Sequence, residues 1–229
     1  MGVCGTVTGS VGPMATILII GGHGKVALRL APLLAENGDR VLSWVRHRDQ
    51  FDDVRAAGAE PVLADVETMD VAAMTMAFAG VDAVVWSAGA GGGNPARTYA
   101  VDRDAAIRSM QAAVAAGVPR YVMVSWSGST PDHGVSPDSS FYPYADAKLA
   151  ADEHLRGTDL DWTILAPGVL TLDDPTGRIT MQSAPRGERT SRGNVALAIR
   201  AALAQPATIG RFIRFADGDV PVEEAFAGL

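Results

Sequence analysis

The sequence has little of what disulfides, metal clusters or membrane anchors need. Its one cysteine, Cys4, excludes an internal disulfide framework and a cysteine-based metal cluster. The four histidines are scattered and show no metal-ligand spacing. The one solid apolar run near the N-terminus, residues 17–20, is far shorter than the roughly 20 residues that a membrane-spanning helix requires. We therefore expect no bound metal and no membrane partner.

Positive charge is also scarce. The 229 residues include 19 basic and 26 acidic side chains, which give a formal net charge of −7. This balance argues against a nucleic-acid partner, because nucleic-acid-binding proteins usually present a basic face. Only two of the basic residues are lysines, and alanine is abundant, as in proteins from GC-rich bacterial genomes. We expect a cytoplasmic protein that acts on a small-molecule substrate as a monomer or a homodimer.

The composition fits an ordinary globular domain. Hydrophobic residues make up 48% of the chain and charged residues 20%. Residues 1–13 are rich in Gly, Ser and Thr and lack helix or strand signals, so we expect a disordered leader, with Met14 as an alternative start. Residues 14–229 contain no internal repeat and no linker-like break, which predicts a single domain.

Short β-branched runs alternate with longer segments that are rich in Ala and Leu. Several runs are apolar throughout, as in strands that are covered on both faces of a parallel sheet. The expected strands are residues 16–20, 40–45, 60–63, 83–87, 120–125, 162–165 and 212–215. The expected helices are residues 25–37, 50–57, 69–78, 97–116, 144–156, 193–204 and 222–226. This order predicts a doubly wound α/β fold with a mostly parallel, Rossmann-like sheet of about seven strands and helices on both faces.

The turn after the first strand has the spacing G-x-x-G-x-x-A. Gly21 permits a tight turn, Gly24 lets the backbone approach a pyrophosphate, and Ala27 lets the following helix pack closely. The N-terminus of that helix offers free N–H groups and a positive dipole to an anion. The alternative is a tight turn without a ligand, in which His23 is an exposed turn residue. The candidate dinucleotide-binding residues of this turn are Gly21, Gly22, His23, Gly24, Lys25 and Val26.

Two arginines follow the second expected strand, where an NAD site usually carries an acid for the ribose hydroxyls. Asp39 precedes this strand, and no acid follows it before Asp49. Arg46 and Arg48 suit a 2′-phosphate in charge and in bidentate geometry. The residues therefore favour NADP(H) over NAD(H), unless both arginines are simply solvated surface residues.

Tyr144 and Lys148 have the spacing Y-x-x-x-K, which places both side chains on one face of a helix. A nearby ammonium group stabilises a phenolate and so lowers the pKa of a tyrosine. Such a pair supplies a general acid for carbonyl reduction or a base for alcohol oxidation. The alternative is an ordinary pair on a helix surface.

Together, the glycine turn, the Y-x-x-x-K pair and the strand pattern resemble the short-chain dehydrogenase/reductase superfamily. The small size and the G-x-x-G-x-x-A turn are similar to its atypical branch of NAD(P)-binding, NmrA-like or epimerase-like single-domain members. The resemblance covers about residues 15–229. Its motifs are specific for the fold and the cofactor and poorly specific for the substrate.

The resemblance implies roles for further residues. Asp102 stands where larger members carry a structural asparagine, which leaves an Asn-based proton relay in doubt. Ser125 and Ser127 compete for the serine that bonds the reacting carbonyl, and Ser127 is preferred because Ser125 still belongs to the expected strand. The implied cofactor contacts are Asp65 and Val66 at the adenine, Ser87, Ala88 and Gly89 beside the ribose, and Pro167, Gly168 and Val169 at the nicotinamide.

These assignments predict hydride transfer between NADP(H) and a small carbonyl or alcohol. Tyr144 exchanges the proton, Lys148 lowers the pKa of Tyr144 and holds the nicotinamide ribose, and Ser127 or Ser125 orients the substrate oxygen. An epimerase or dehydratase that begins with hydride abstraction is an alternative. A redox sensor that binds NADP(H) without turnover is another. The polar segment 128–143 is long for a connection, which is typical of a substrate lid or a disordered loop.

Overall fold

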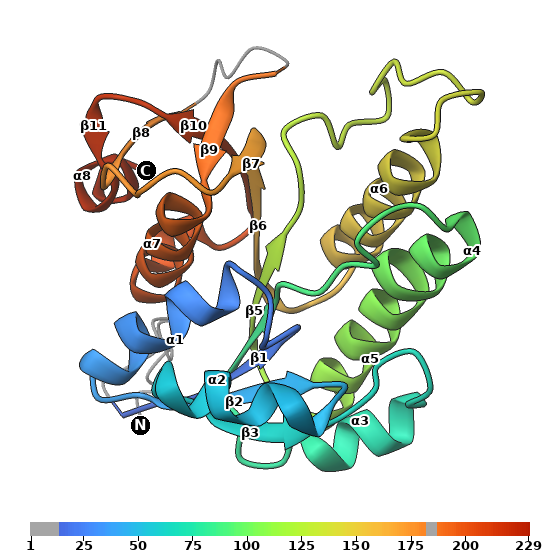
Figure 1. Cartoon of the computed structure of the whole chain (residues 1–229), viewed down its shortest axis with the longest axis vertical. Coiled ribbons are helices and arrows are strands. Elements are labelled where there is room, and N and C mark those ends of the chain that lie inside the picture. Colours follow the sequence, from blue (N-terminus) through green and yellow to red (C-terminus); the bar gives the residue numbers. More distant parts are fainter. Residues whose placement is uncertain (1–13, 182–186) are drawn as a thin grey trace, which may run out of the picture.

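A nine-stranded sheet forms the centre of the computed structural model, which describes residues 14–181 and 187–229 (Figure 1). The predicted leader at residues 1–13 lies outside the described residues. Seven parallel strands run in the order β10-β6-β5-β4-β1-β2-β3, which confirms the doubly wound, Rossmann-like prediction. Their bounds are β1 (Thr16–Ile20), β2 (Arg40–Val45), β3 (Glu60–Leu63), β4 (Ala83–Trp86), β5 (Arg120–Val124), β6 (Asp161–Pro167) and β10 (Arg211–Asp217).

Helices cover both faces of the sheet, as Figure 1 shows for α1 and α7 on one side and α3, α5 and α6 on the other. The first layer comprises α1 (Ala27–Glu36), α2 (Phe51–Ala56), α7 (Arg192–Ala204) and α8 (Val222–Ala227). The second comprises α3 (Val71–Ala77), α4 (Pro95–Thr98), α5 (Ala106–Ala116) and α6 (Tyr142–Arg156). The structure also has two single turns of 3₁₀-helix, η1 (Arg48–Gln50) and η3 (Pro206–Thr208).

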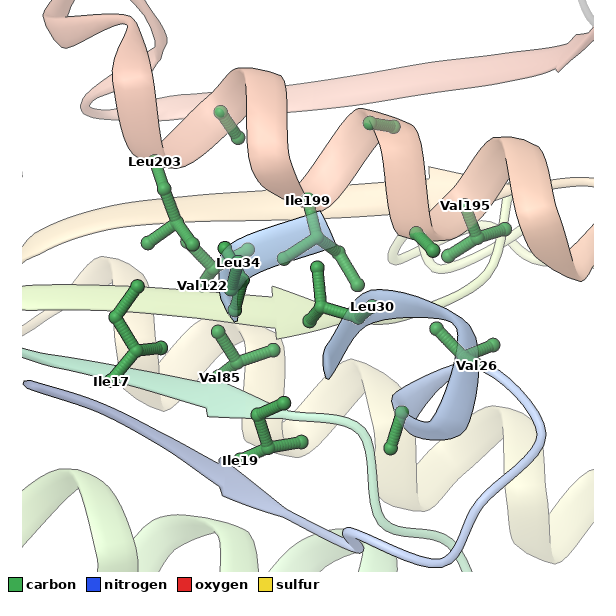
Figure 2. Close-up of a cluster of buried hydrophobic side chains, with 14 of the residues drawn as sticks. Ile17, Ile19, Val26, Leu30, Leu34, Val85, Val122, Val195, Ile199 and Leu203 are labelled. Carbon is green, nitrogen blue, oxygen red and sulfur yellow. The ribbon is translucent and has the colours of Figure 1, made fainter. Parts of the chain in front are cut away.

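Residues 17–20 of β1 are all apolar because successive side chains enter two different cores. Ile17 and Ile19 of β1 pack with α1 and α7, as Figure 2 shows. Leu18 and Ile20 point to the opposite core, under α3 and α5. All four side chains are almost completely buried, which accounts for the lack of a polar alternation in the sequence of this strand.

The expected helix 97–116 is divided in the structure. It consists of α4, a π-helical segment η2 (Tyr99–Ala105) and α5. A π-helix is rare and is found frequently at functional sites. Composition does not distinguish it from an α-helix, because the difference lies in which carbonyl each N–H group bonds.

Four short strands were not predicted. β8 (Arg178–Met181) runs antiparallel to β10, and β11 (Val220–Pro221) runs antiparallel to β8. β7 (Val169–Thr171) and β9 (Arg189–Ser191) form a separate parallel pair. Each has two to four residues, so its strand geometry depends on its pairing partner more than on its own propensity.

Arg120 links three elements from inside the protein. Its side chain is 2% exposed at the start of β5. The guanidinium donates to the carbonyl oxygens of Asp161 (2.5 Å) and Ala202 (2.7 Å) and to the hydroxyls of Thr163 and Thr208. Burial lowers the pKa of Arg120 to about 10, which still leaves the group charged at neutral pH.

We expect Arg120→Met to lower the free energy of unfolding by about 2–4 kcal/mol, because it keeps the apolar stem and leaves buried acceptors without a charged donor. Urea denaturation measures this loss. The exposed Arg55 of α2 provides the control, and Arg55→Met should change stability by less than about 0.5 kcal/mol. Equal stability of the two variants would contradict the structural role of Arg120.

Candidate functional site

The turn between β1 and α1 is pressed against two neighbouring strands. Gly21 has a φ of +88°, and a Cβ atom there would lie 2.6 Å from the Cα atom of Ala88. A Cβ atom on Gly22 would lie 2.5 Å from the Cβ atom of Ser43 in β2. The N–H of Gly24 closes the turn by donating to the carbonyl of Gly21 at 2.8 Å. A side chain at either of the first two positions would therefore push the turn away from the sheet.

The side chains of the next two residues, Lys25 and Val26, do not line the cavity at this turn. Val26 points into the core beneath α1 (Figure 2). Lys25 is exposed, and its carbonyl accepts a hydrogen bond from Arg29. Among the described residues, no side chain caps the N-terminus of α1. The N–H groups of Leu28 and Leu30 donate to the carbonyls of Gly24 and Val26, so the N–H groups of Val26 and Ala27, which have no acceptor among the described residues, are the ones that a phosphate would meet.

A cavity of about 240 Å³ adjoins the glycine turn, and we call it the turn cavity. Eight of the predicted cofactor residues line this cavity, namely Gly21, His23, Gly24, Arg46, Val66, Ser87, Ala88 and Gly89. Its other lining residues were not predicted and are Trp44, Val45, Gln50, Ala64, Glu67, Arg97 and Val101. His23 is held at its rim by Asp53, whose carboxylate oxygen lies 2.8 Å from Nε2.

Charged side chains meet on one wall of the turn cavity. One carboxylate oxygen of Glu67 accepts hydrogen bonds from Arg46 and Arg97, each at 3.0 Å. Arg48, predicted to act with Arg46, lies outside the cavity lining, with its guanidinium 5.8 Å from the ring centroid of Phe51. Arg97 is the second arginine of the cavity, and its position on a different segment hid it from sequence reasoning.

Two aspartates shape the backbone around the turn cavity. Asp65 does not line it, and its carboxylate instead accepts from the N–H of Glu67 at 3.0 Å. Asp102 is 1% exposed on η2 and accepts from the N–H of Ala90 at 3.0 Å. It therefore holds the segment after β4 that forms one side of the cavity. Gly89 leaves room for this carboxylate, since a Cβ atom there would lie 3.2 Å from Oδ1.

Tyr144 and Lys148 lie one turn apart on α6, as the Y-x-x-x-K spacing predicted. Lys148 is 1% exposed, and its ammonium donates to the carbonyl of Val124 at the end of β5 at 2.8 Å. Burial lowers the pKa of Lys148, while the nearby carboxylates of Asp152 and Asp102 act in the opposite direction.

The electrostatic effect on Tyr144 differs from the one predicted. Desolvation raises the pKa of this tyrosine well above its ordinary value, and Asp102 and Asp152 raise it further. The expectation of a lowered pKa for Tyr144 is therefore wrong for this arrangement, because desolvation dominates and the two carboxylates add to it. Tyr144 is a neutral phenol at neutral pH.

Asp152 is the main residue of this region that sequence reasoning missed. It is fully buried one turn after Lys148, and one of its carboxylate oxygens accepts from the hydroxyls of Ser125 (2.5 Å) and Ser129 (2.6 Å). Burial raises the pKa of Asp152, and Lys148 lowers it. The spacing Y-x-x-x-K-x-x-x-D, which places three ionisable groups on one helix face, was the available signal.

A second cavity of about 450 Å³ lies beyond Tyr144, and we call it the aromatic cavity. Its lining contains both candidate serines, Ser125 and Ser127. The Ser125 hydroxyl is engaged by Asp152, whereas the Ser127 hydroxyl has no hydrogen-bond partner among the described residues. The remaining lining residues are Trp126, His133, Gly134, Val135, Phe141, Tyr144, Pro167, Gly168, Val169, Leu170 and Gly187.

The expected substrate-lid segment, residues 128–143, contributes to this second cavity through His133, Gly134, Val135 and Phe141. The predicted nicotinamide-side residues, Pro167, Gly168 and Val169, form the neighbouring wall. Gly168 is required there, because a Cβ atom would lie 2.1 Å from the carbonyl oxygen of Glu188.

The fold, the crowded glycine turn and the two cavities at the carboxyl ends of the strands define a dinucleotide-binding protein of the Rossmann class. The sequence profile of the NAD(P)H-binding family matches residues 21–206. The chain belongs to this family, which confirms its resemblance to the atypical, NmrA-like short-chain dehydrogenases/reductases.

Similar proteins align over almost the whole chain. A Bacillus subtilis protein named as an uncharacterized sugar epimerase is 33% identical and covers 93% of this chain and 99% of its own length. The structure of a Bacillus halodurans protein, named as an NAD-dependent epimerase/dehydratase, has a TM-score of 0.87 at 31% identity over 94% of this chain and 100% of its own. The oxidoreductase ylbE of Lactococcus lactis has a TM-score of 0.82 at 28% identity, with 93% and 96% covered.

Within residues 14–181 and 187–229, no helix is both long and apolar enough to cross a membrane. The same residues contain no group of three or more His, Cys, Asp or Glu side chains that could hold a metal ion.

We expect Asp152→Ala to lower the free energy of unfolding by about 2–4 kcal/mol, because two buried hydroxyls lose their acceptor and Lys148 loses a counter-charge. Asp152→Asn should cost less, since its side-chain oxygen still accepts from both serines. Chemical denaturation of the two variants measures the difference. The neighbouring Glu153 is exposed, so Glu153→Gln is the control, and a matching loss in all three variants would contradict this account.

Proposed function

We propose that the protein is an NADP(H)-dependent oxidoreductase that transfers hydride to or from a small carbonyl or alcohol substrate. The observation that carries this proposal is the shared cavity of Tyr144, Ser127 and the 167–169 wall, which supports the role of Tyr144 as a proton donor to a substrate bound there. A bound nicotinamide supplies or accepts the hydride there. Relatives named as oxidoreductases and epimerases support this class of chemistry.

The crowded turn fits the cofactor, because Gly21 and Gly22 leave no space for side chains and the N–H groups of Val26 and Ala27, at the start of α1, have no acceptor among the described residues. The pyrophosphate would lie at this turn, and the adenosine would occupy the turn cavity. The nicotinamide would extend past Ala88 and Gly89 toward Pro167. This placement uses the two cavities as the two ends of one extended ligand.

The state of Tyr144 favours reduction. Because its pKa is raised by desolvation and by two carboxylates, its hydroxyl carries a proton at neutral pH and can donate it to a developing alkoxide. Ser127 is the better candidate to orient the same oxygen, since the hydroxyl of Ser125 is bound to Asp152. Lys148 then acts mainly by fixing the end of β5 through Val124.

Arg46 and Arg97 support the preference for NADP(H). Both line the turn cavity and converge on one oxygen of Glu67, so an incoming 2′-phosphate could replace this carboxylate as their acceptor. Arg48 is left as a surface residue that lies near Phe51.

We expect Arg46→Ala to weaken NADPH binding roughly ten- to a hundredfold and NADH binding only a few-fold, because only NADPH carries the 2′-phosphate. Titration calorimetry measures both affinities. Arg48→Ala is the matched control and should leave the ratio of the two affinities unchanged. A similar loss for both cofactors on Arg46→Ala would exclude this arginine as the phosphate ligand.

Tyr144→Phe should lower kcat about 10²- to 10⁴-fold, because it removes the positioned general acid and keeps the ring. The affinity for NADPH should remain within a few-fold of the parent. Steady-state oxidation of NADPH across a panel of aldehydes, ketones and quinones measures turnover. Tight NADPH binding without any turnover in the unmodified protein would instead support the redox-sensor alternative.

Tyr99→Phe serves as the control for this change, since Tyr99 lies outside both cavities, with its ring 4.7 Å from the guanidinium carbon of Arg103. The pH profile provides a second check. A group that acts in its protonated form and has a raised pKa stays active as pH rises, so kcat/KM for reduction should be level between about pH 6 and 9. A fall in kcat/KM within that window that Tyr144→Phe abolishes would show that the pKa is lowered in the working enzyme.

A further inference from the structure

Three aromatic rings form one wall of the aromatic cavity. The centroid of Trp126 lies 5.1 Å from that of Phe141, with the ring planes at 85°, and 6.4 Å from that of Tyr144. Phe141 and Tyr144 are 5.2 Å apart. These spacings are typical of aromatic rings that pack against one another, so the wall is stabilised before any ligand arrives.

The indole ring is also held from behind. A Cβ atom on Gly128 would lie 2.1 Å from Cζ3 of Trp126, so the ring rests directly on the backbone of this glycine. Val135, Val169 and Leu170 add aliphatic surface to the lining. Phe141 is 43% exposed and Val169 57% exposed, which leaves an apolar rim at the cavity. Exposed apolar surface of this kind often marks a place where a ligand binds.

Polar groups in this lining are few. The hydroxyl of Ser125 donates to Asp152, and Nδ1 of His133 accepts from the N–H of Val135. The hydroxyls of Ser127 and Tyr144 are then the groups best placed to meet a substrate oxygen. Two hydroxyls suffice for one carbonyl group, but a sugar ring would bring several hydroxyls that each need a partner.

The described part of the lining of the aromatic cavity has no arginine or lysine side chain. A nucleotide sugar carries a diphosphate that proteins usually hold with arginine, lysine or a helix N-terminus. The described part of the lining, with residues 182–186 left aside, therefore offers no arginine or lysine to such a diphosphate.

We propose that the aromatic cavity takes a flat, uncharged, conjugated carbonyl compound of one or two fused rings, such as a naphthoquinone, rather than a sugar. The inference rests on the proposed function and names the substrate class of that site. The substrate ring lies against Trp126 and Phe141, and one carbonyl oxygen reaches Ser127 and Tyr144. A cavity of about 450 Å³ is within the size range of small-molecule sites.

The proposed reaction balances with the reduced nicotinamide cofactor as the electron donor. The quinone gains two electrons and one proton as hydride, and its oxygen gains a second proton from Tyr144. The products are the hydroquinone and the oxidised cofactor, and Tyr144 regains its proton from water.

Binding is tested without turnover by titrating 2-methyl-1,4-naphthoquinone into the full chain saturated with NADP⁺, which has no hydride to give. We expect saturable binding to one site, weakened about five- to thirtyfold by Trp126→Leu and by Phe141→Leu. Phe212→Leu is the matched control, because Phe212 lies near the start of β10 at the opposite end of the sheet, and it should leave the affinity unchanged. Uridine diphosphate glucose, titrated in the same way, should not bind.

Tighter binding of the nucleotide sugar than of the quinone would overturn the proposal, as would quinone binding that neither cavity substitution weakens. The proposed substrate class and the proposed hydride-transfer function can be refuted independently. Quinone binding without oxidation of NADPH would leave the substrate class standing and refute the hydride-transfer function. If the protein does not bind the quinone but reduces an aliphatic ketone in a Tyr144-dependent way, the hydride-transfer function stands and the proposed substrate class is refuted.

Discussion

Lys148 carries an ammonium group into the protein interior, and three elements of the site are arranged around it. Its hydrogen bond to Val124 fixes the end of β5, from which Ser125, Trp126 and Ser127 continue into the aromatic cavity. Asp152 provides a negative charge from the same helix and accepts hydrogen bonds from Ser125 and Ser129, which lie in the loop after β5. Removing a charge from water is costly unless partners surround it, so each of these groups depends on the others staying in place.

Asp102 extends this arrangement to the other cavity. It contributes negative charge toward Lys148 and, through Ala90, holds the segment that lines the turn cavity. The end of β4 and the end of β5 are therefore both positioned by buried carboxylates near one ammonium group. This arrangement explains how a site made from several loops can have a defined geometry on a sheet that supplies few polar side chains of its own.

The sequence was sufficient for the parallel strands and for most of the glycine turn, because buried parallel strands are continuous β-branched runs and the turn tolerates few residue types. β8 and β11 escaped prediction because their geometry comes from pairing with distant segments. The direction of the pKa shift of Tyr144 was predicted wrongly, since the spacing gives proximity along a helix but not the burial of the hydroxyl or the carboxylates around it. Arg97 and Asp152 were missed for the related reason that their partners lie far away in the sequence.

The π-helical segment η2 has a consequence for how this site can change. A π-helix contains an extra residue relative to an α-helix of the same rise, so deletion of one residue here would let α4 and α5 merge into a continuous α-helix. One α-helical residue corresponds to a rotation of about 100°, and Asp102 would turn away from Ala90 by a comparable angle. The extra residue thus rotates the start of the helix relative to its end. As a result, α5 keeps its apolar side on the sheet, while Asp102 in the preceding turn accepts from the backbone beside the turn cavity. A change in the number of residues between α4 and α5 would alter the core and the site at once.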